Sequence, residues 1–189
     1  MEVEKFREFI SEIVYLEAQE LDLVISKCRL KVIPKGKLVL KAGQIASQYY
    51  YIVRGGLRFY YELNDREITT WVCFKNEFFT EISSLHPQKP TRFNIQAIEE
   101  TVLIVLDKKD MDFLYAYIPG WEEFGRKIWE ATVARMIDQL LNFQTLSAEE
   151  RYRRFLSTPE MLQKIPINQL ASILGITPNA LSRIRNKIK

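Results

Sequence analysis

The spacing of apolar residues changes twice along this 189-residue chain. Residues 1 to 30 carry apolar side chains three and four positions apart, such as Phe6, Phe9 and Ile13, which is the pattern of an amphipathic helix. Residues 31 to 106 show short β-type runs separated by turn-forming residues, and helical spacing returns after residue 106. This order predicts an α+β protein rather than one built on a parallel sheet.

Seven short strands are predicted between residues 31 and 106. Their sequences are LKVI, KLVL, YYYIV, LRFYYEL, REITTWVCF, FNIQAI and TVLIVL. Asn64-Asp65, between the fourth and fifth runs, is typical of a two-residue hairpin turn. Short strands joined by tight turns favour a compact β-barrel or jelly roll.

Composition and single-residue chemistry exclude several classes of protein. A content of 47% hydrophobic and 12% aromatic residues is enough for a buried core. No apolar stretch reaches the ~18 residues that cross a bilayer, and the N-terminus has no signal-peptide pattern, so we expect a cytoplasmic protein without membrane contact. Cys28 and Cys73 are expected to be small buried hydrophobic residues, and the single histidine, His86, precedes a proline in a loop. No metal site and no cofactor are therefore expected.

A short helix capped by Asp107, with Asp110 in its first turn, is expected before Pro119-Gly120 interrupts the pattern. A long helix follows, from about Trp121 to Phe143. One apolar seam in it has coiled-coil spacing and consists of Trp129, Val133, Met136, Leu140 and Phe143. A neighbouring stripe consists of Phe124, Ile128, Ile137 and Leu141. We expect the seam from Trp129 to Phe143 to form the dimer interface with a second copy of the chain and the neighbouring stripe to cover the β-structure; the alternative is a wholly intramolecular core helix.

The C-terminal residues carry helix start and stop signals at close intervals. Ser147 and Glu150 form a capping box, and Thr158-Pro159-Glu160 is expected to cap the next helix. Gly175 ends a short helix over Ile167 to Leu174, and Thr177 caps a final helix whose first residue is Pro178. The last two helices share an apolar wedge formed by Leu170, Ala171, Leu174, Ile176, Leu181, Ile184 and Ile188. This pattern predicts a helix-turn-helix.

The outer face of the final helix carries groups that pair with base edges in the major groove of DNA. Asn179, Ser182, Arg183 and Asn186 lie on that face, where arginine suits guanine and asparagine suits adenine. Arg185, Lys187 and Lys189 lie beside it and suit phosphates. The set expected to contact DNA is completed by residues at the starts of the two helices, namely Asn168, Thr177 and Pro178.

The charge distribution agrees with a polyanion-binding end. Residues 151 to 189 hold eight Lys or Arg and one acidic residue, Glu160, so they carry +7 and leave −4 for residues 1 to 150 of the total of +3. A helical hairpin that merely packs is the alternative, and it would favour mixed charges on its exposed face. No acidic residue follows Glu160, which favours DNA.

The whole chain resembles one family of bacterial transcription regulators. The segments KGKLVLKAGQ, YYYIVRGGLRFYY and NEFFTEISSL, followed by a long helix and a terminal helix-turn-helix, resemble the cyclic-AMP receptor protein family, also called the CRP/FNR family. The resemblance implies a cyclic-nucleotide-binding-like β-roll with flanking helices over residues 1–120, a dimerisation helix over 121–144 and a DNA-binding domain over 145–189. It also places Arg183 on the family's guanine-reading arginine. Asn179 and Pro178 replace the family's usual glutamate and arginine, so a different target sequence is expected.

The residues at the family's effector pocket depart from its pattern. Cyclic-nucleotide binders of the family have a glycine-glutamate pair and then an arginine-serine pair, and here Thr80-Glu81 and Thr91-Arg92 stand at those places. A shift by one residue in an extended segment turns the arginine to the opposite face. Apolar side chains also stand near the position of the base, from Phe93, Met136 and Ile137. The pocket is therefore expected not to respond to cyclic AMP, and a cyclic-nucleotide-responsive regulator is the alternative.

These observations together predict a non-enzymatic homodimer that binds a pseudo-palindromic site in double-stranded DNA. RNA polymerase and an unidentified small-molecule effector are further partners to be tested. A cupin-like metal enzyme would need several converging ligands, which one histidine cannot supply. A sensor module that acts through protein or RNA contacts is the remaining alternative.

Overall fold

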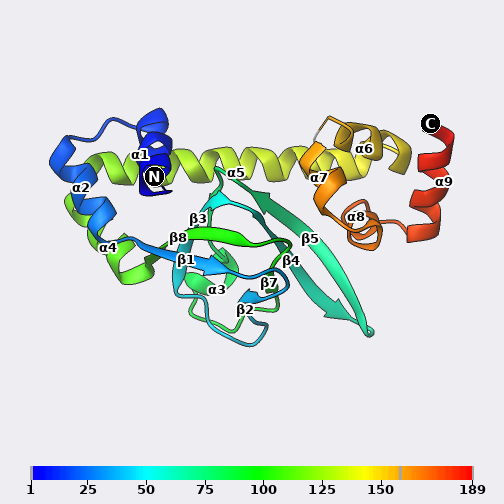
Figure 1. Cartoon of the computed structure of the whole chain (residues 1–189), viewed down its shortest axis with the longest axis horizontal. Helices are drawn as coiled ribbons and strands as arrows, with labels where there is room; N and C mark the ends of the chain where they lie inside the picture. The colour runs from blue at the N-terminus through cyan, green and yellow to red at the C-terminus, as the bar shows by residue number, and fades with distance from the viewer. Residues whose placement is uncertain (1, 158, 189) are drawn as a thin grey trace.

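The computed structural model describes residues 2–157 and 159–188. Its helices are α1 (Glu2–Ile13), α2 (Ala18–Ser26), α3 (Ile82–Leu85), α4 (Lys108–Tyr117), α5 (Pro119–Thr145), α6 (Ala148–Phe155), α7 (Pro159–Lys164), α8 (Ile167–Ile173) and α9 (Pro178–Ile188). Helix α5 runs along the molecule, with α1, α2 and α4 at one end and α6 to α9 at the other (Figure 1). A β-roll lies beside the middle of α5. The helix runs past the roll and connects the two groups of helices (Figure 1).

The β-roll consists of two four-stranded antiparallel sheets, with strand orders β1-β8-β3-β6 and β2-β7-β4-β5. The strands are β1 (Arg29–Ile33), β2 (Leu38–Leu40), β3 (Gln48–Arg54), β4 (Gly56–Leu63), β5 (Arg66–Phe74), β6 (Phe78–Phe79), β7 (Asn94–Ala97) and β8 (Thr101–Asp107). Asn64 and Asp65 have φ angles of 49° and 58°, which confirms the two-residue hairpin between β4 and β5. The seven predicted strands are present, and β6 was missed because two residues are too short to show a pattern.

Aromatic side chains fill the space between the roll and the helices that close it. Phe6 of α1 lies 4.8 Å from Tyr51 of β3 between ring centroids, and Trp121 stacks on Phe124 at 4.4 Å in the first turns of α5. All four side chains are essentially inaccessible to solvent. Burial of rings this large contributes roughly 2–3 kcal/mol each, which attaches α1 and the start of α5 firmly to the roll.

The start of α4 differs from the prediction in one respect. Asp107 occupies the N-cap position, but its side chain makes no capping hydrogen bond. Instead its carboxylate accepts hydrogen bonds from Arg29 Nη1 and Nη2 at 2.8 and 2.7 Å, and from Gln48 Nε2 at 2.9 Å. The hydrogen bonds from Arg29 lower the pKa of Asp107 to about 2. The Asp107 side chain therefore links the end of β8 to β1 and β3 and does not cap the first turn of α4.

Pro119 and Gly120 begin the long helix instead of preceding it. Proline is accepted at the first helical position because its missing N–H would have no partner there. A Cβ atom on Gly120 would lie 2.6 Å from Leu16 Cδ2 and 3.0 Å from the Tyr15 carbonyl oxygen. Glycine thus allows α5 to start directly against the α1–α2 connection.

The predicted caps at the C-terminal end are present where the structure describes them. Ser147 and Glu150 form the capping box of α6, with Ser147 N donating to Glu150 Oε2 at 2.8 Å. Gly175 has a φ of 69°, the left-handed conformation that ends α8. Thr177 Oγ1 accepts a hydrogen bond from Ala180 N at 3.2 Å at the start of α9. Thr158, the predicted cap of α7, lies outside the described residues.

Candidate nucleic-acid interface

Helices α8 and α9 form the predicted helix-turn-helix around one small apolar core. Leu170, Ala171, Leu174 and Leu181 are buried in it, and Ile176, Ile184 and Ile188 pack against it partly buried. The Ile176 N–H donates to the Ala171 carbonyl oxygen at 3.0 Å, which closes the turn between the helices. The wedge therefore sets the angle at which α9 leaves α8.

The outward face of α9 is free to meet another molecule. Asn179, Ser182, Arg183 and Asn186 are all exposed, and α9 lies at the outer end of the molecule (Figure 1). Thr177 and Pro178, at the start of α9, are also exposed. The structure thus brings the four predicted base-reading side chains together on one unobstructed helical face.

The predicted phosphate-contacting side chains have different surroundings. Arg185 is exposed, whereas Lys187 Nζ lies 2.8 Å from Glu149 Oε2 on α6. Glu149 also pairs with Arg153 at 2.9 Å. Hydrogen bonds from Lys187 and then from Arg153 lower the pKa of Glu149. An acidic group therefore lies beside the basic surface. The charge of residues 151 to 189 does not include it, because Glu149 precedes that range. Lys189 lies outside the described residues.

Asn168 lies at the start of α8, where its Oδ1 accepts a hydrogen bond from the Gln169 backbone N–H at 3.0 Å. Next to it, a small depression of about 130 Å³ separates the start of α8 from α9. The residues that line the depression are Ile167, Ser182, Arg185 and Asn186. Arg185 therefore points toward the same surface as Ser182 and Asn186 rather than away from it.

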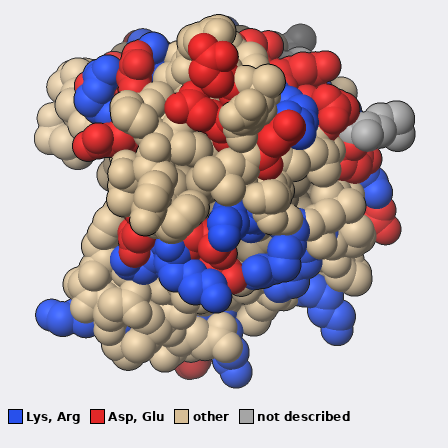
Figure 2. Space-filling model, turned by 90° about the vertical axis from the view of Figure 1, so that its left-hand side faces the viewer, with Lys and Arg blue, Asp and Glu red and all other residues tan. Residues whose placement is uncertain are grey.

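The opposite end of the molecule has a different character. The surface around α1, α2 and α4 carries Asp and Glu side chains together with Lys and Arg side chains (Figure 2). Several of these charges are paired across the surface, for example Arg7 with Asp22 at 2.7 Å. Residues 2 to 29 carry seven acidic and four basic side chains, so this end of the molecule does not favour a polyanion.

Helix α8 is docked on the edge strand of the roll. The Thr69 N–H of β5 donates to Ser172 Oγ at 2.9 Å, and Lys164 Nζ lies 2.7 Å from Glu99 Oε1. Phe74 and Ile98 of the roll are buried in the same apolar cluster as the helix-turn-helix core. Helices α6 to α9 therefore contact the β-roll directly and are not attached to the molecule through α5 alone.

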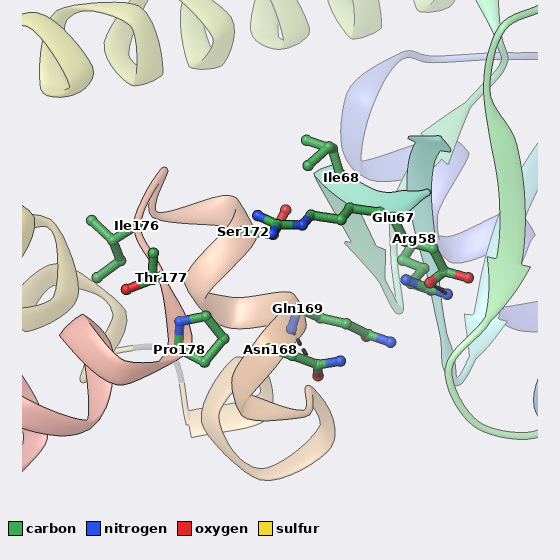
Figure 3. A pocket seen from close by; sticks show the side chains of 10 residues that line it. Arg58, Glu67, Ile68, Asn168, Gln169, Ser172, Ile176, Thr177 and Pro178 are labelled. Carbon is green, nitrogen blue, oxygen red and sulfur yellow. Dashed lines mark hydrogen bonds and ion pairs between the residues drawn. The ribbon is translucent and has the colours of Figure 1, made fainter. Parts of the chain in front are cut away.

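A cavity of about 610 Å³ separates the β4–β5 hairpin from α8 and the start of α9 (Figure 3). Arg58, only 3% exposed, lines it and donates to Gln96 Oε1 at 2.7 and 2.9 Å and to Glu67 Oε2 at 2.5 Å. Among the described residues, Gln169 Oε1 on the facing helix is buried without a hydrogen-bond partner. Sequence patterns offered no signal for this cavity because its walls come from segments more than a hundred residues apart.

The predicted effector residues of the roll divide into buried and exposed groups. Thr80, Glu81 and Thr91 are buried, and Glu81 Oε1 accepts hydrogen bonds from Ser83 N at 3.1 Å and Ser83 Oγ at 2.6 Å. Arg92 is exposed, with its guanidinium 5.4 Å from the centre of the Phe93 ring. Thr91 is therefore buried and the adjacent Arg92 is exposed, at a bend that precedes β7.

Met136 and Ile137 project from the solvent-facing side of α5, at 55% and 52% exposure. The contacts described for the chain do not join either of them to Thr80, Glu81 or Thr91. The structure therefore does not bring the seven predicted effector residues into one site within a single chain.

The stripe of α5 formed by Phe124, Ile128, Ile137 and Leu141 is buried at one end only, which differs from the prediction. Phe124 is buried in the roll core and Ile128 packs against it, but Ile137 and Leu141 of the same predicted stripe are exposed. Nine residues separate Ile128 from Ile137, about two and a half helical turns, so they face opposite sides. The exposed apolar surface, here called the α5 seam, consists of Val133, Met136, Ile137, Leu140 and Leu141.

Two residues of the predicted dimer seam have partners within the chain. Trp129 packs partly buried against the roll core. The Phe143 ring lies 4.7 Å from the Arg151 guanidinium and sits where a Cβ on Gly175 would approach it to 3.1 Å. Phe143 therefore packs against the turn of the helix-turn-helix, although 48% of it remains exposed.

We also searched the described residues for a metal site, a membrane-spanning helix and a reactive cysteine. Residues 2–157 and 159–188 contain no group of three or more His, Cys, Asp or Glu that could hold a metal ion. None of the helices in these ranges is long and apolar enough to cross a membrane. Cys73 is buried and Cys28 partly so, and burial raises the pKa of Cys28 to about 12, so neither thiol is reactive.

Comparison with known proteins identifies the fold. Residues 30–117 match the cyclic nucleotide-binding domain family. FixK2 from Bradyrhizobium japonicum superposes with a TM-score of 0.70 at 18% identity, covering 85% of this chain and 84% of FixK2. The c-di-GMP responsive global regulator CLP from Xanthomonas campestris gives 0.68 at 17% identity, with 91% of both chains covered.

A third structure, from Eubacterium rectale and assigned to the CRP/FNR family of transcriptional regulators, gives a TM-score of 0.70 at 16% identity. It covers 89% of this chain, which matches 82% of that protein. No curated protein sequence matches the chain. Residues 30–117 are therefore similar to cyclic nucleotide-binding domains, and the chain as a whole has the fold of the CRP/FNR-type transcription regulators.

Proposed function

We propose that this protein is a sequence-specific DNA-binding transcription regulator of the CRP/FNR type. One observation carries the proposal: α9 presents two amides, a hydroxyl and a guanidinium on a fully exposed face at the outer end of the molecule. A recognition helix contacts base edges with groups of this kind. Arg183 suits the O6 and N7 atoms of guanine, and Asn179 and Asn186 suit adenine.

A homodimer is the proposed active form, and the domain limits 1–120, 121–144 and 145–189 describe its parts. The α5 seam supports it, since five neighbouring apolar side chains that are each about half exposed are a typical association surface. Pairing of two seams would place two α9 helices about one turn of B-DNA apart, ~34 Å. Such a dimer reads a pseudo-palindromic site, and nothing in this mode of action requires catalysis.

Control by cyclic AMP is not part of the proposal. The side chain at the place of the phosphate-binding arginine is Thr91, and Arg92 points to solvent. Loss of a charge-assisted contact to the cyclic phosphate removes the strongest expected interaction. Calorimetry with cyclic AMP is expected to show no saturable heat, and micromolar binding would restore the cyclic-nucleotide-responsive alternative.

Selection of bound duplexes from a random pool tests the proposal. We expect enrichment of an inverted repeat whose half-site centres are about 10 base pairs apart. Recovery of unrelated duplexes, or a preference for single strands, would favour a sensor module acting through RNA or protein contacts. Partners such as RNA polymerase can then be tested on the selected site.

A further inference from the structure

A second cavity lies where α5 ends and the DNA-binding unit begins. It has a volume of about 230 Å³ and is here called the junction cavity. Four elements form its walls: the end of α5, helix α6, helix α8 and strand β5. The residues that matter for its chemistry are Asn142, Phe143, Arg151, Arg154, Phe155 and Ile173.

Arg151 links the parts of this junction, and within the described part of the chain its Nε is an unpaired donor. Its Nη1 donates to the Leu146 carbonyl oxygen at 2.7 Å, and its Nη2 donates to the Leu174 carbonyl oxygen at 3.0 Å. Its Nε is buried and has no hydrogen-bond partner among the described residues. A buried, unpaired donor on a charged group is costly, so an acceptor that reached Nε would be bound favourably.

The charge of the walls indicates which acceptor fits. Arg154 is the second cation, with Nη1 donating to Asn142 Oδ1 at 2.7 Å, and the residues described as lining the cavity include no acidic side chain. Aromatic and aliphatic side chains form the rest of the wall, from Phe143, Phe155 and Ile173. Two guanidinium groups beside apolar walls suit an organic anion, because a carboxylate matches the arginine donors and an apolar body matches the rest.

The volume limits the size of the anion. A protein cavity of about 150 Å³ is known to hold benzene. The junction cavity is larger by roughly half, which leaves room for one ring and one carboxylate. The ligand class is therefore a small monocarboxylate with an aromatic ring or a branched aliphatic chain.

The junction cavity is lined by Phe143 of the predicted dimer seam, but by none of the five residues of the α5 seam. Gln139 and Asn142 line it, and Gln139 is about three helical turns from Ile128, on the side of α5 that faces the roll. Both residues are partly buried, whereas Ile137 of the α5 seam faces the opposite side. A second copy bound through the seam would leave the cavity accessible.

We propose that the junction cavity binds a small aromatic or branched aliphatic carboxylate, with the anion on Arg151 and Arg154 and the apolar body against Phe143 and Phe155. Such a ligand touches α5, α6 and α8 at once. It would therefore stabilise one position of the DNA-binding unit, and ligand and DNA would change each other's affinity by the same factor. The binding site stands alone, whereas this coupling rests on the proposed function.

Calorimetry on the full chain tests the site, with benzoate and isovalerate as probes. Benzyl alcohol has the ring without the charge, and inorganic phosphate has the charge without the ring. We expect saturable binding of a carboxylate and at least about tenfold weaker binding of both controls. Equal binding of benzyl alcohol would show a merely apolar cavity, and equal binding of phosphate would show an adventitious ion only; either result overturns the proposal.

Two matched variants locate the ligand. Arg154→Met removes the second cation and keeps an aliphatic side chain of similar length. Arg153→Met is the control, because it makes the same change at the preceding residue of α6, which does not line the cavity. We expect Arg154→Met to weaken benzoate binding about tenfold or more and Arg153→Met to leave it unchanged. Equal losses in the two variants would contradict the assignment.

Nitrogen-15 NMR of the wild-type chain provides a readout that does not depend on a variant of Arg151 folding. The Nε–H resonance of Arg151 is expected to shift with benzoate and not with benzyl alcohol, and an unmoved resonance during saturable binding would overturn the proposed contact. DNA binding is measured separately. If benzoate binds without changing DNA affinity, the coupling is wrong; if no DNA binds at all, the proposed function fails while the site stands.

Discussion

Arg183 and Lys187 lie about one turn apart on α9, yet their surroundings give them different roles. Arg183 is exposed in the middle of the face proposed to read bases, whereas Lys187 lies at the side of that face and pairs with Glu149. A guanidinium can form two hydrogen bonds with guanine, and an ammonium contributes mainly charge. The same type of truncation at the two positions should therefore have different consequences.

Arg183→Ala is expected to weaken binding to the selected operator by ~1–3 kcal/mol and to relax the preference at one base pair. Lys187→Ala is expected to weaken all duplexes alike and to reduce the slope of log K against log salt by ~1. Fluorescence anisotropy at two salt concentrations, on the operator and on a scrambled duplex, measures both effects. Equal, sequence-independent losses in the two variants would refute the assignment of Arg183.

Asp107 provides a test of the roll that does not involve DNA. Its pKa is lowered to about 2 by Arg29, so its ionised form stabilises the folded state above the unfolded-state pKa of about 4. We expect Asp107→Asn to lower the free energy of unfolding by roughly 1 kcal/mol at neutral pH, after allowing for solvent screening. The difference from wild type should disappear as the pH falls from about 4 to about 2.

Denaturant titrations across this pH range measure the effect, with Asp112→Asn as the control. Asp112 pairs with Lys108 on the surface of α4, and its side chain is 52% exposed. Exposed pairs four residues apart on a helix contribute only ~0.3–0.5 kcal/mol. A loss from Asp107→Asn no larger than that of the control would contradict the role given to the Arg29 pair.

Among the elements, α5 does two tasks on two faces. One face packs on the roll through Phe124 and Ile128, and the other presents the α5 seam to solvent. A seam this apolar is stable in water when a second seam covers it. The dimer is therefore the element-level prediction of the structure.

Leu140→Glu is expected to convert the dimer to a monomer, since a carboxylate would be desolvated at the centre of the interface. Leu140 is 57% exposed in the single chain, and Leu63 at the β4–β5 hairpin tip is 52% exposed, so Leu63→Glu is a matched control. Sedimentation velocity should show loss of the dimer only for Leu140→Glu. A wild-type chain that sediments as a monomer at every concentration would disprove the dimer.

Helix α8 carries the second element-level prediction, because it covers an edge strand. Ser172 Oγ accepts from the Thr69 N–H, which would otherwise be a buried unpaired donor on β5. Ser172→Ala is expected to cost ~1–3 kcal/mol and to speed hydrogen exchange at the Thr69 amide. Unchanged exchange at Thr69 in the variant would mean that the docking of α8 on β5 does not depend on this contact.

For the whole molecule, the features predicted from sequence are those that depend on near neighbours. The Asn64-Asp65 turn, the Ser147–Glu150 box and the Thr177 cap are each decided within four residues, and they are present. The order of helix, roll, long helix and helix-turn-helix follows from periodicity, which records burial on one face.

The features that were missed depend on distant parts of the chain. Arg29 and Asp107 are 78 residues apart, Ser172 and Thr69 are 103 apart, and Lys187 and Glu149 are 38 apart. No local pattern links such pairs, because only the tertiary arrangement brings them together. The same reason explains why Ile137 was placed in the stripe expected to cover the roll. It also explains why neither cavity beside the helix-turn-helix was predicted.

The central claim is that the exposed face of α9 reads a DNA sequence, and one titration tests it most directly. The full chain is titrated at fixed, near-physiological salt with the selected operator and with a scrambled duplex of the same length and composition. We predict that the operator binds at least ~10³-fold more tightly, the usual lower limit for specific regulators. Equal affinity for the two duplexes would contradict the claim, because charge alone would then account for binding.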